Sequence, residues 1–75
     1  MNVLAQDPWS FTLEEDGERL LFVVVCGTVA AYDVVLELTD DERAAWSIEG
    51  VAALRALAAR VQANPKAYAE RSVRR

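Results

Sequence analysis

The sequence predicts an α+β domain: a three-stranded antiparallel β-meander, then one long α-helix packed on one face of the sheet, then a short C-terminal helix. Three observations support this βββαα order. Residues 9–14 alternate apolar and polar side chains, residues 20–26 are apolar and rich in β-branched side chains, and residues 39–42 have the composition of a helix cap. A period of two is typical of strands, and a Thr-x-x-Glu motif before an apolar repeat is typical of a helix start.

The first two predicted strands are residues 9–14 and residues 20–26. The alternation in the first strand predicts one buried and one exposed face. The second strand has no polar interruption, so we expect it to be the central strand, with both faces covered. Asp16-Gly17 lies between the two strands and suits a tight hairpin turn, because both residue types tolerate a positive φ.

Two registers of this hairpin are compatible with the sequence. A two-residue loop at Asp16-Gly17 places Phe11 opposite Phe22, and we favour it because it gathers aromatic side chains. A three-residue loop that includes Glu18 instead pairs Glu15 with Arg19. Since side chains alternate along a strand, this second loop would turn the faces of the central strand over.

A third strand is expected over residues 29–38, after a second tight connection that starts at Gly27. Its alternation defines two faces. The inner face is expected to carry the apolar set Tyr32, Val34, Leu36 and Leu38. The outer face is expected to carry Ala31, Asp33, Val35 and Glu37.

The long helix is expected to begin at Thr39, whose side chain caps it while Glu42 reaches back to the cap. Apolar or small residues recur at spacings of three and four and mark its buried stripe: Ser47, Gly50, Val51, Leu54, Leu57, Ala58 and Val61. Glycine inside a helix is costly, so Gly50 indicates either a close approach to the sheet, which we favour, or a break. Asn64-Pro65 ends the helix, and a short helix over residues 65–72 would dock Tyr68.

The length of 75 residues predicts a single small domain over residues 1–75, with residues 1–6 and 73–75 flexible. A chain of this size is marginally stable unless a disulfide, a metal ion or oligomerisation supplements its core. Cys26 is the single cysteine and there is no histidine. These counts exclude an internal disulfide and disfavour a zinc site, so oligomerisation is the supplement that we expect.

The net charge of −4 disfavours nonspecific binding to nucleic acid or to an anionic membrane. The charge is unevenly distributed: residues 1–42 hold ten acids and one base, a sum of −9, and residues 43–75 hold seven bases and two acids, a sum of +5. The two halves should therefore attract each other. The first ten residues lack a basic start and a long apolar run, so we expect a cytoplasmic protein.

No residue type in this chain has the partner that catalysis usually needs. Cys26 and the serines have no histidine to activate them, so we interpret Cys26 as a packed thiol. Asp33 is the one acid in an apolar stretch, and we interpret it as a solvated edge residue or as a hydrogen-bonding group at an interface. The acidic clusters 14–16 and 40–42 lack the ligand spacing of a calcium loop. We therefore predict no catalytic, cofactor-binding or metal-binding residues and no enzymatic activity.

The central strand is apolar on both faces, and one helix layer covers only one face of a sheet. The second face should therefore be a surface for another protein, most simply a second copy of the chain that binds by stacking sheets or by pairing edge strands. We predict a non-enzymatic interaction domain that forms a homodimer or binds a protein partner. The candidate interface residues are Leu21, Val23, Val25, Ala31, Asp33, Val35 and Trp46.

Two alternatives of other classes stay open. A pocket between Tyr32, Trp46 and the sheet would suit a small-molecule-binding regulatory subunit. The C-terminal arginines would suit a dimeric regulator associated with nucleic acid, although the acidic remainder of the chain opposes this. The order of hairpin, third strand, Thr-x-x-Glu cap and alanine-rich helix resembles short bacterial proteins of unassigned role, and no residue role follows from that likeness.

Overall fold

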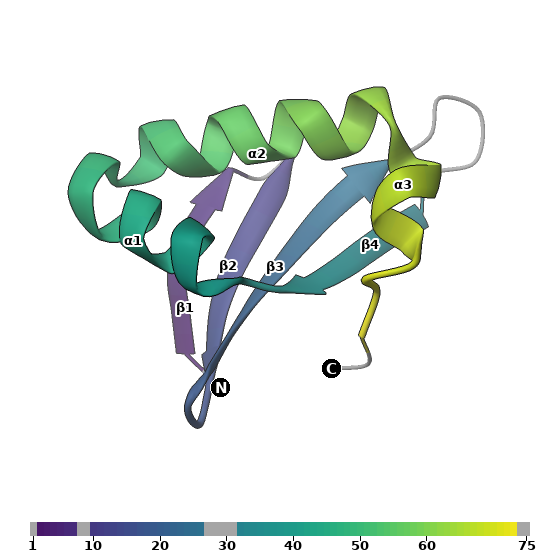
Figure 1. The fold of residues 1–75 in the computed structure, drawn as a ribbon. Coiled ribbons are helices and arrows are strands. Elements are labelled where there is room, and N and C mark those ends of the chain that lie inside the picture. Colours follow the sequence, from purple (N-terminus) through teal and green to yellow (C-terminus); the bar gives the residue numbers. More distant parts are fainter. Residues whose placement is uncertain (1, 8–9, 27–31, 74–75) are drawn as a thin grey trace.

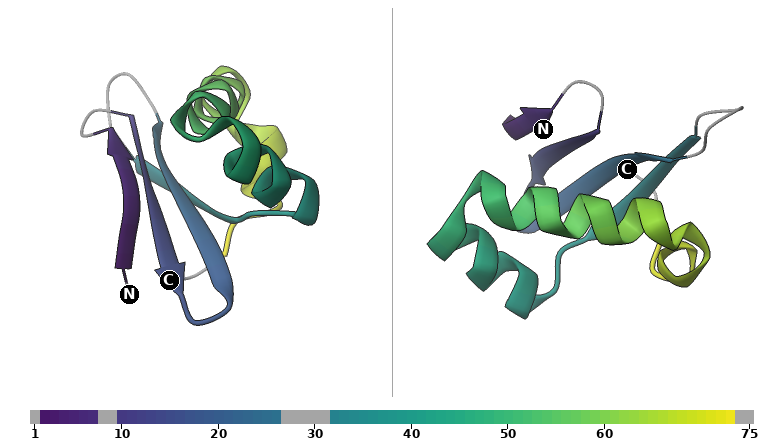
Figure 2. Two further views of the ribbon diagram at one scale, coloured as in Figure 1. Left: turned by 90° about the vertical axis from the view of Figure 1, so that its left-hand side faces the viewer. Right: turned by 90° about the horizontal axis from the view of Figure 1, so that it is seen from above.

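The computed structural model describes residues 2–7, 10–26 and 32–73, which form one antiparallel sheet and three helices. The strands are β1 (Asn2–Asp7), β2 (Phe11–Asp16), β3 (Arg19–Cys26) and β4 (Tyr32–Glu37), and they lie in the order β1-β2-β3-β4. The helices are α1 (Asp40–Glu49), α2 (Val51–Ala63) and α3 (Pro65–Ala69). All three lie on the same side of the sheet (Figure 1, Figure 2). The predicted α+β class is confirmed.

The sheet has four strands, and the prediction of three was wrong. The additional strand is β1, where we expected a flexible N-terminal segment through residue 6. It pairs with β2 from Asn2 opposite Glu15 to Asp7 opposite Phe11, and the register shifts between Val3 and Ala5. This shift is a β-bulge, which bends a strand locally. Most of β1 is exposed, so its sequence carries little of the alternation that reveals a half-buried strand.

The β2–β3 hairpin turns at Gly17-Glu18, and the register that we favoured was wrong. Asp16 pairs with Arg19 and Phe11 faces Val24. Gly17 has φ 62° at the first position of this two-residue loop, where a type II′ turn requires glycine. An ion pair of 3.3 Å between Arg19 Nη2 and Asp16 Oδ2 closes the turn. Because the register differs from the favoured one by two residues, the faces of β3 are the predicted ones.

The inner face of the sheet and the helices enclose the main core. Val34, Leu36 and Leu38 are buried there as predicted. Tyr32 lies on the same face, opposite the buried Cys26, but its side chain is 50% exposed. The Phe11 and Phe22 rings also meet in this core, with centroids 5.3 Å apart. The predicted third strand is β4. Gly27 and residues 28–31, which include its expected start and the expected second turn, lie outside the described residues, as does Trp9.

The capping box at Thr39 is confirmed. The Glu42 amide donates to Thr39 Oγ1 over 3.2 Å, and the Thr39 amide donates to Glu42 Oε1 over 2.9 Å. The helix that follows is not continuous, however. Gly50 separates α1 from α2 with φ 66° and ψ −139°, a conformation open to glycine and strained for other residues. A side-chain carbon placed at Gly50 would meet nothing within 4 Å, so the favoured close approach to the sheet was wrong and the break is what the structure has.

The break leaves α1 without a buried residue, and only the α2 part of the predicted stripe is buried: Leu54, Leu57, Ala58 and Val61. Ser47 and Val51 are exposed, so their assignment to the stripe was wrong. The Gln62 side chain ties α2 to β3 by donating to the Val25 carbonyl over 3.0 Å. The predicted last helix is present as α3, and Tyr68 packs partly buried against the main core.

Candidate interaction surfaces

The second face of the sheet, opposite the helices, holds a small apolar cluster. It consists of Leu21, Val23 and Val35, with the partly buried Val73 packed against them. Leu21 is 0% exposed and Val35, the most exposed of the three, is 9% exposed. We expected these side chains to form a bare apolar surface, and that expectation was wrong because the single chain already covers them. A partner gains little by docking on side chains that water no longer reaches.

The other predicted interface residues lie at different places on the molecule. Val25 is half-buried and Asp33, its cross-strand neighbour on β4, is exposed. Ala31 lies outside the described residues. Trp46 of α1 is half-buried against the main core on the helix side. The structure therefore brings Leu21, Val23 and Val35 together, and it places Trp46 on the other side of the sheet.

The outer edge of β1 is the first edge of the sheet. β1 pairs with β2 on one side, and no other described strand lies on its far side (Figure 1, Figure 2). Two large apolar side chains are exposed here, Val3 at 58% and Leu4 at 41%. An edge strand presents unpaired backbone donors and acceptors, and proteins often guard such an edge with lysine, proline or a bulge. The stretch 2–6 has the bulge but neither lysine, proline nor any charged residue.

The outer edge of β4 is the second edge, and the C-terminal segment lies along it. Ser72 forms an antiparallel bridge with Leu36, and the Val73 amide donates to the Val35 carbonyl over 2.8 Å. The same segment brings the Val73 side chain onto the second-face cluster. One short segment thus covers both part of an edge and part of a face.

Arg71 fixes this segment to the rest of the chain. Its guanidinium donates to both carboxylate oxygens of Glu42, over 2.7 Å from Nη2 to Oε1 and 3.2 Å from Nη1 to Oε2. Nη2 also lies 3.3 Å from the Glu37 carbonyl, and the guanidinium carbon lies 5.7 Å from the centre of the Tyr68 ring. A paired geometry of this kind is the stronger form of an arginine–carboxylate contact. It joins the C-terminal segment to the cap of α1 and to the end of β4.

The pKa of Glu42 reflects this contact. Partial burial acts to raise it, but the hydrogen bonds from Arg71 and Thr39 and the positive charge of Arg71 together outweigh burial, so that the pKa of Glu42 is below its ordinary value. The hydrogen bond to Glu42 likewise raises the pKa of Arg71. Glu42 is therefore ionised at neutral pH, and its charge serves the helix cap and the Arg71 contact at once.

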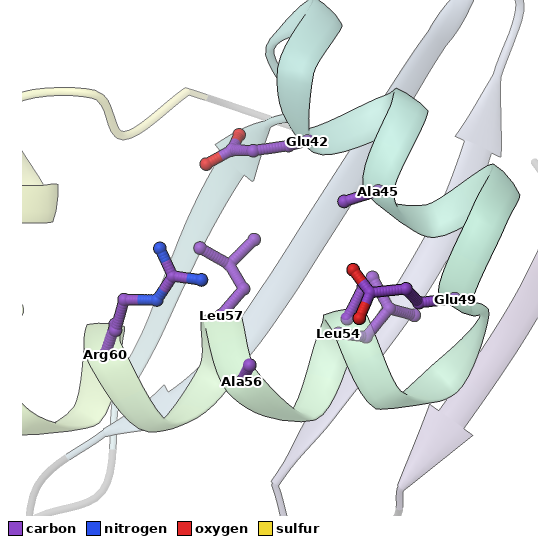
Figure 3. A pocket seen from close by; sticks show the side chains of 8 residues that line it. Glu42, Ala45, Glu49, Leu54, Ala56, Leu57 and Arg60 are labelled. Atoms are coloured by element: carbon purple, nitrogen blue, oxygen red, sulfur yellow. The ribbon is translucent and has the colours of Figure 1, made fainter.

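A groove lies between α1 and α2 (Figure 3), the two helices that Gly50 separates. Its volume is about 200 Å³, and it is lined by Glu42, Ala45, Glu49, Ala53, Leu54, Ala56, Leu57 and Arg60. The pocket that we expected between Tyr32 and Trp46 does not coincide with it, since neither residue lines the groove. Pockets for drug-sized ligands usually hold about 300–1,000 Å³. The groove is therefore small for such a ligand.

Cys26 is a buried free thiol in the sheet. Burial raises its pKa, and the nearby charge of Asp33 raises it further. A thiol with a raised pKa is a poor nucleophile, because the reactive form is the thiolate. Within residues 2–7, 10–26 and 32–73, no three side chains of the metal-ligating types gather as a metal site would require, and no helix is long and apolar enough to cross a membrane.

Sequence reasoning missed the two features that define the edges. Val3 and Leu4 were assigned to a flexible segment, although two adjacent apolar residues before a predicted hairpin were a signal for an edge strand. The Arg71–Glu42 contact spans 29 residues. The sequence gives only a weak signal for this contact. The excess of bases in the second half of the chain predicts attraction to the acidic first half, but it does not identify which residues pair.

Searches of family models, of curated proteins and of solved structures find no match to this chain.

Proposed function

We propose that this chain is a non-enzymatic protein-interaction domain that forms a homodimer by pairing the outer edges of two β1 strands. The two strands would run antiparallel about a two-fold axis and join two four-stranded sheets into one of eight strands. The observation that carries the proposal is the exposure of Val3 and Leu4 on an uncharged stretch of edge strand. Pairing would satisfy the backbone groups of that edge and remove apolar surface from water.

The size of the domain supports the same proposal. A core enclosed by 75 residues gives a small margin of stability, and association is a common supplement. The second face of the sheet is the weaker candidate surface, because its apolar cluster is covered within the chain. The groove between α1 and α2 is small, so the geometry favours a protein partner over a small molecule.

Sedimentation equilibrium of the wild type and of Leu4→Lys tests the proposal. Lysine on an edge strand disfavours pairing with another strand, so we expect the dissociation constant to rise about tenfold or more. The matched control is Tyr32→Lys, which adds the same charge at a similarly exposed position on β4. A wild type that sediments as a monomer at tens of micromolar, or equal weakening by both variants, would contradict the proposal.

A further inference from the structure

We propose that residues Arg71–Val73 form a strap that closes the β4 edge to a second copy of the chain, so that association through β1 stops at the dimer. A sheet with two open edges can add further chains at both ends, whereas a sheet with one open edge closes after one addition. The part of this inference that concerns the dimer rests on the proposed function. The part that concerns β4 rests on the contacts of the strap alone.

The strap occupies the positions that an added strand would take. Ser72 bridges Leu36, and the Val73 amide uses the Val35 carbonyl, so two neighbouring residues of the β4 edge are engaged. The Val73 side chain also packs against the apolar cluster on the second face of the sheet. A strand from another chain could not pair along the middle of β4 while the strap is in place.

Two side-chain anchors hold the strap, and both lie near the surface. Arg71 contacts Glu42 and the Glu37 carbonyl, and Val73 contacts the second-face cluster. Arg71, Val73 and Glu42 are each only partly buried. Short surface segments with few buried contacts open at a lower free energy than the core. Opening the strap would therefore expose the β4 edge and leave the main core intact.

The uncovered β4 edge fits a second copy of β4 in antiparallel pairing. A register centred on Val34 sets Tyr32 opposite Leu36 and Asp33 opposite Val35, and it keeps the inner faces of both sheets on one side. A register centred on Val35 would set Asp33 opposite Glu37, and like charges in opposite positions are destabilising. The pairing centred on Val34 is therefore the one that we expect after release of the strap.

A double variant, Arg71→Ala with Val73→Ala, removes both side-chain anchors and keeps the length of the chain. The matched control is Arg55→Ala with Val51→Ala, which makes the same two truncations on the exposed surface of α2. Sedimentation velocity over a concentration series would measure the weight-average mass, and circular dichroism would verify the fold. We expect the strap variant to have at least twice the mass of the wild type at equal concentration and the control to match the wild type.

Addition of Leu4→Lys to the strap variant tests association through the β4 edge separately from association through the β1 edge. With β1 blocked and β4 open, this variant should sediment as a dimer through β4. A wild-type dimer together with an unchanged mass in the folded strap variant would overturn the strap and leave the β1 proposal standing. A monomeric wild type with a dimeric strap variant would overturn the β1 proposal and support the strap. Should the double variant be unfolded, the single variant Arg71→Ala decides by the same criteria.

Discussion

The two outer edges of the sheet, on β1 and on β4, differ in how well their backbone donors and acceptors are protected from pairing with another strand. The β4 edge has acids at Asp33 and Glu37 and is overlaid by the C-terminal segment. The β1 edge has a bulge and exposed apolar side chains, and its first five residues carry no charge. Charges and coverage keep strand edges from pairing, so β4 is guarded twice and β1 only weakly. One sheet thus has one closed edge and one available edge.

The two edge strands also differ in whether we expect them to contribute to the stability of the fold or to association between chains. β4 lies beside the interior strand β3, and the residues of β4 that face the helices belong to the main core. β1 contributes only the partly buried Ala5 to that core. Changes in β4 should therefore act on the free energy of unfolding, and changes in β1 should act on the dissociation constant of the proposed dimer.

The largest expected effect is on stability, when a leucine is shortened in each edge strand. Leu36→Ala removes a side chain that is 0% exposed and should lower the free energy of unfolding by about 2–5 kcal/mol. Leu4→Ala should lower it by less than about 1 kcal/mol, because much of that side chain is already in water. Urea denaturation at low protein concentration measures both values. Equal losses would show that β1 is as much a part of the core as β4.

The second-largest expected effect is a difference between the two edges in how the hydrogen exchange of their amides depends on protein concentration. The Val73 amide is bonded to the Val35 carbonyl within the chain, so its protection should not depend on protein concentration. Amides of β1 that pair only in the dimer should exchange about tenfold more slowly once the protein is mostly dimeric. Mass spectrometry of exchanged peptides at two concentrations measures this. Concentration-independent exchange in β1 would count against pairing of the β1 edges.

A smaller effect is expected from Glu42→Gln, which keeps one oxygen acceptor but removes the charge facing Arg71. The free energy of unfolding should fall by about 1 kcal/mol, since a hydrogen-bonded ion pair and a helix cap are both weakened. The control is Glu49→Gln at the exposed C-terminal end of α1. Removing an acid there should be neutral or slightly stabilising, because a negative charge opposes the helix dipole at that end.

The smallest expected effect is a change with pH in the difference in free energy of unfolding between the wild type and Glu42→Gln. The pKa of Glu42 in the folded chain is below the ordinary value of 4.5, so its ionised form stabilises the fold at and above that value. This stability is lost as the pH falls through the lowered pKa. The difference between wild type and Glu42→Gln should therefore be constant near neutral pH and shrink below about 4.5. A difference that grew on acidification would contradict the role given to the Arg71 contact.

Features encoded by neighbouring residues were predictable from the sequence. The cap at Thr39 and Glu42 is a contact between residues three apart, and the β3 run needs both faces covered in any arrangement. The hairpin register was missed because loops at residues 16–17 and 17–18 both contain Gly17. The choice between them depends on packing across the sheet and on the Asp16–Arg19 pair.

Features that depend on distant residues were not predictable. A break and a close approach both explain a glycine in a helix, so Gly50 was ambiguous until the position of the sheet was known. The packing of Val73 against the second-face cluster depends on where the C-terminal segment returns, and the Arg71–Glu42 contact helps to fix that segment. The sequence therefore favoured the second face of the sheet as the candidate interaction surface, whereas the structure favours the outer edge of β1.

Distances between spin labels test the central claim most directly, namely that two chains meet at β1 and leave β4 on the outside. Labels would be placed at Gln6→Cys or at Tyr32→Cys, each exposed, in a Cys26→Ala background. With strands about 4.8 Å apart, two β4 strands at opposite ends of an eight-stranded sheet lie about 34 Å from each other if the sheet is flat, and less as it twists. We predict a short distance for the Gln6 labels and a long one for the Tyr32 labels; a short distance between Tyr32 labels, or no distance at either site, would contradict the account.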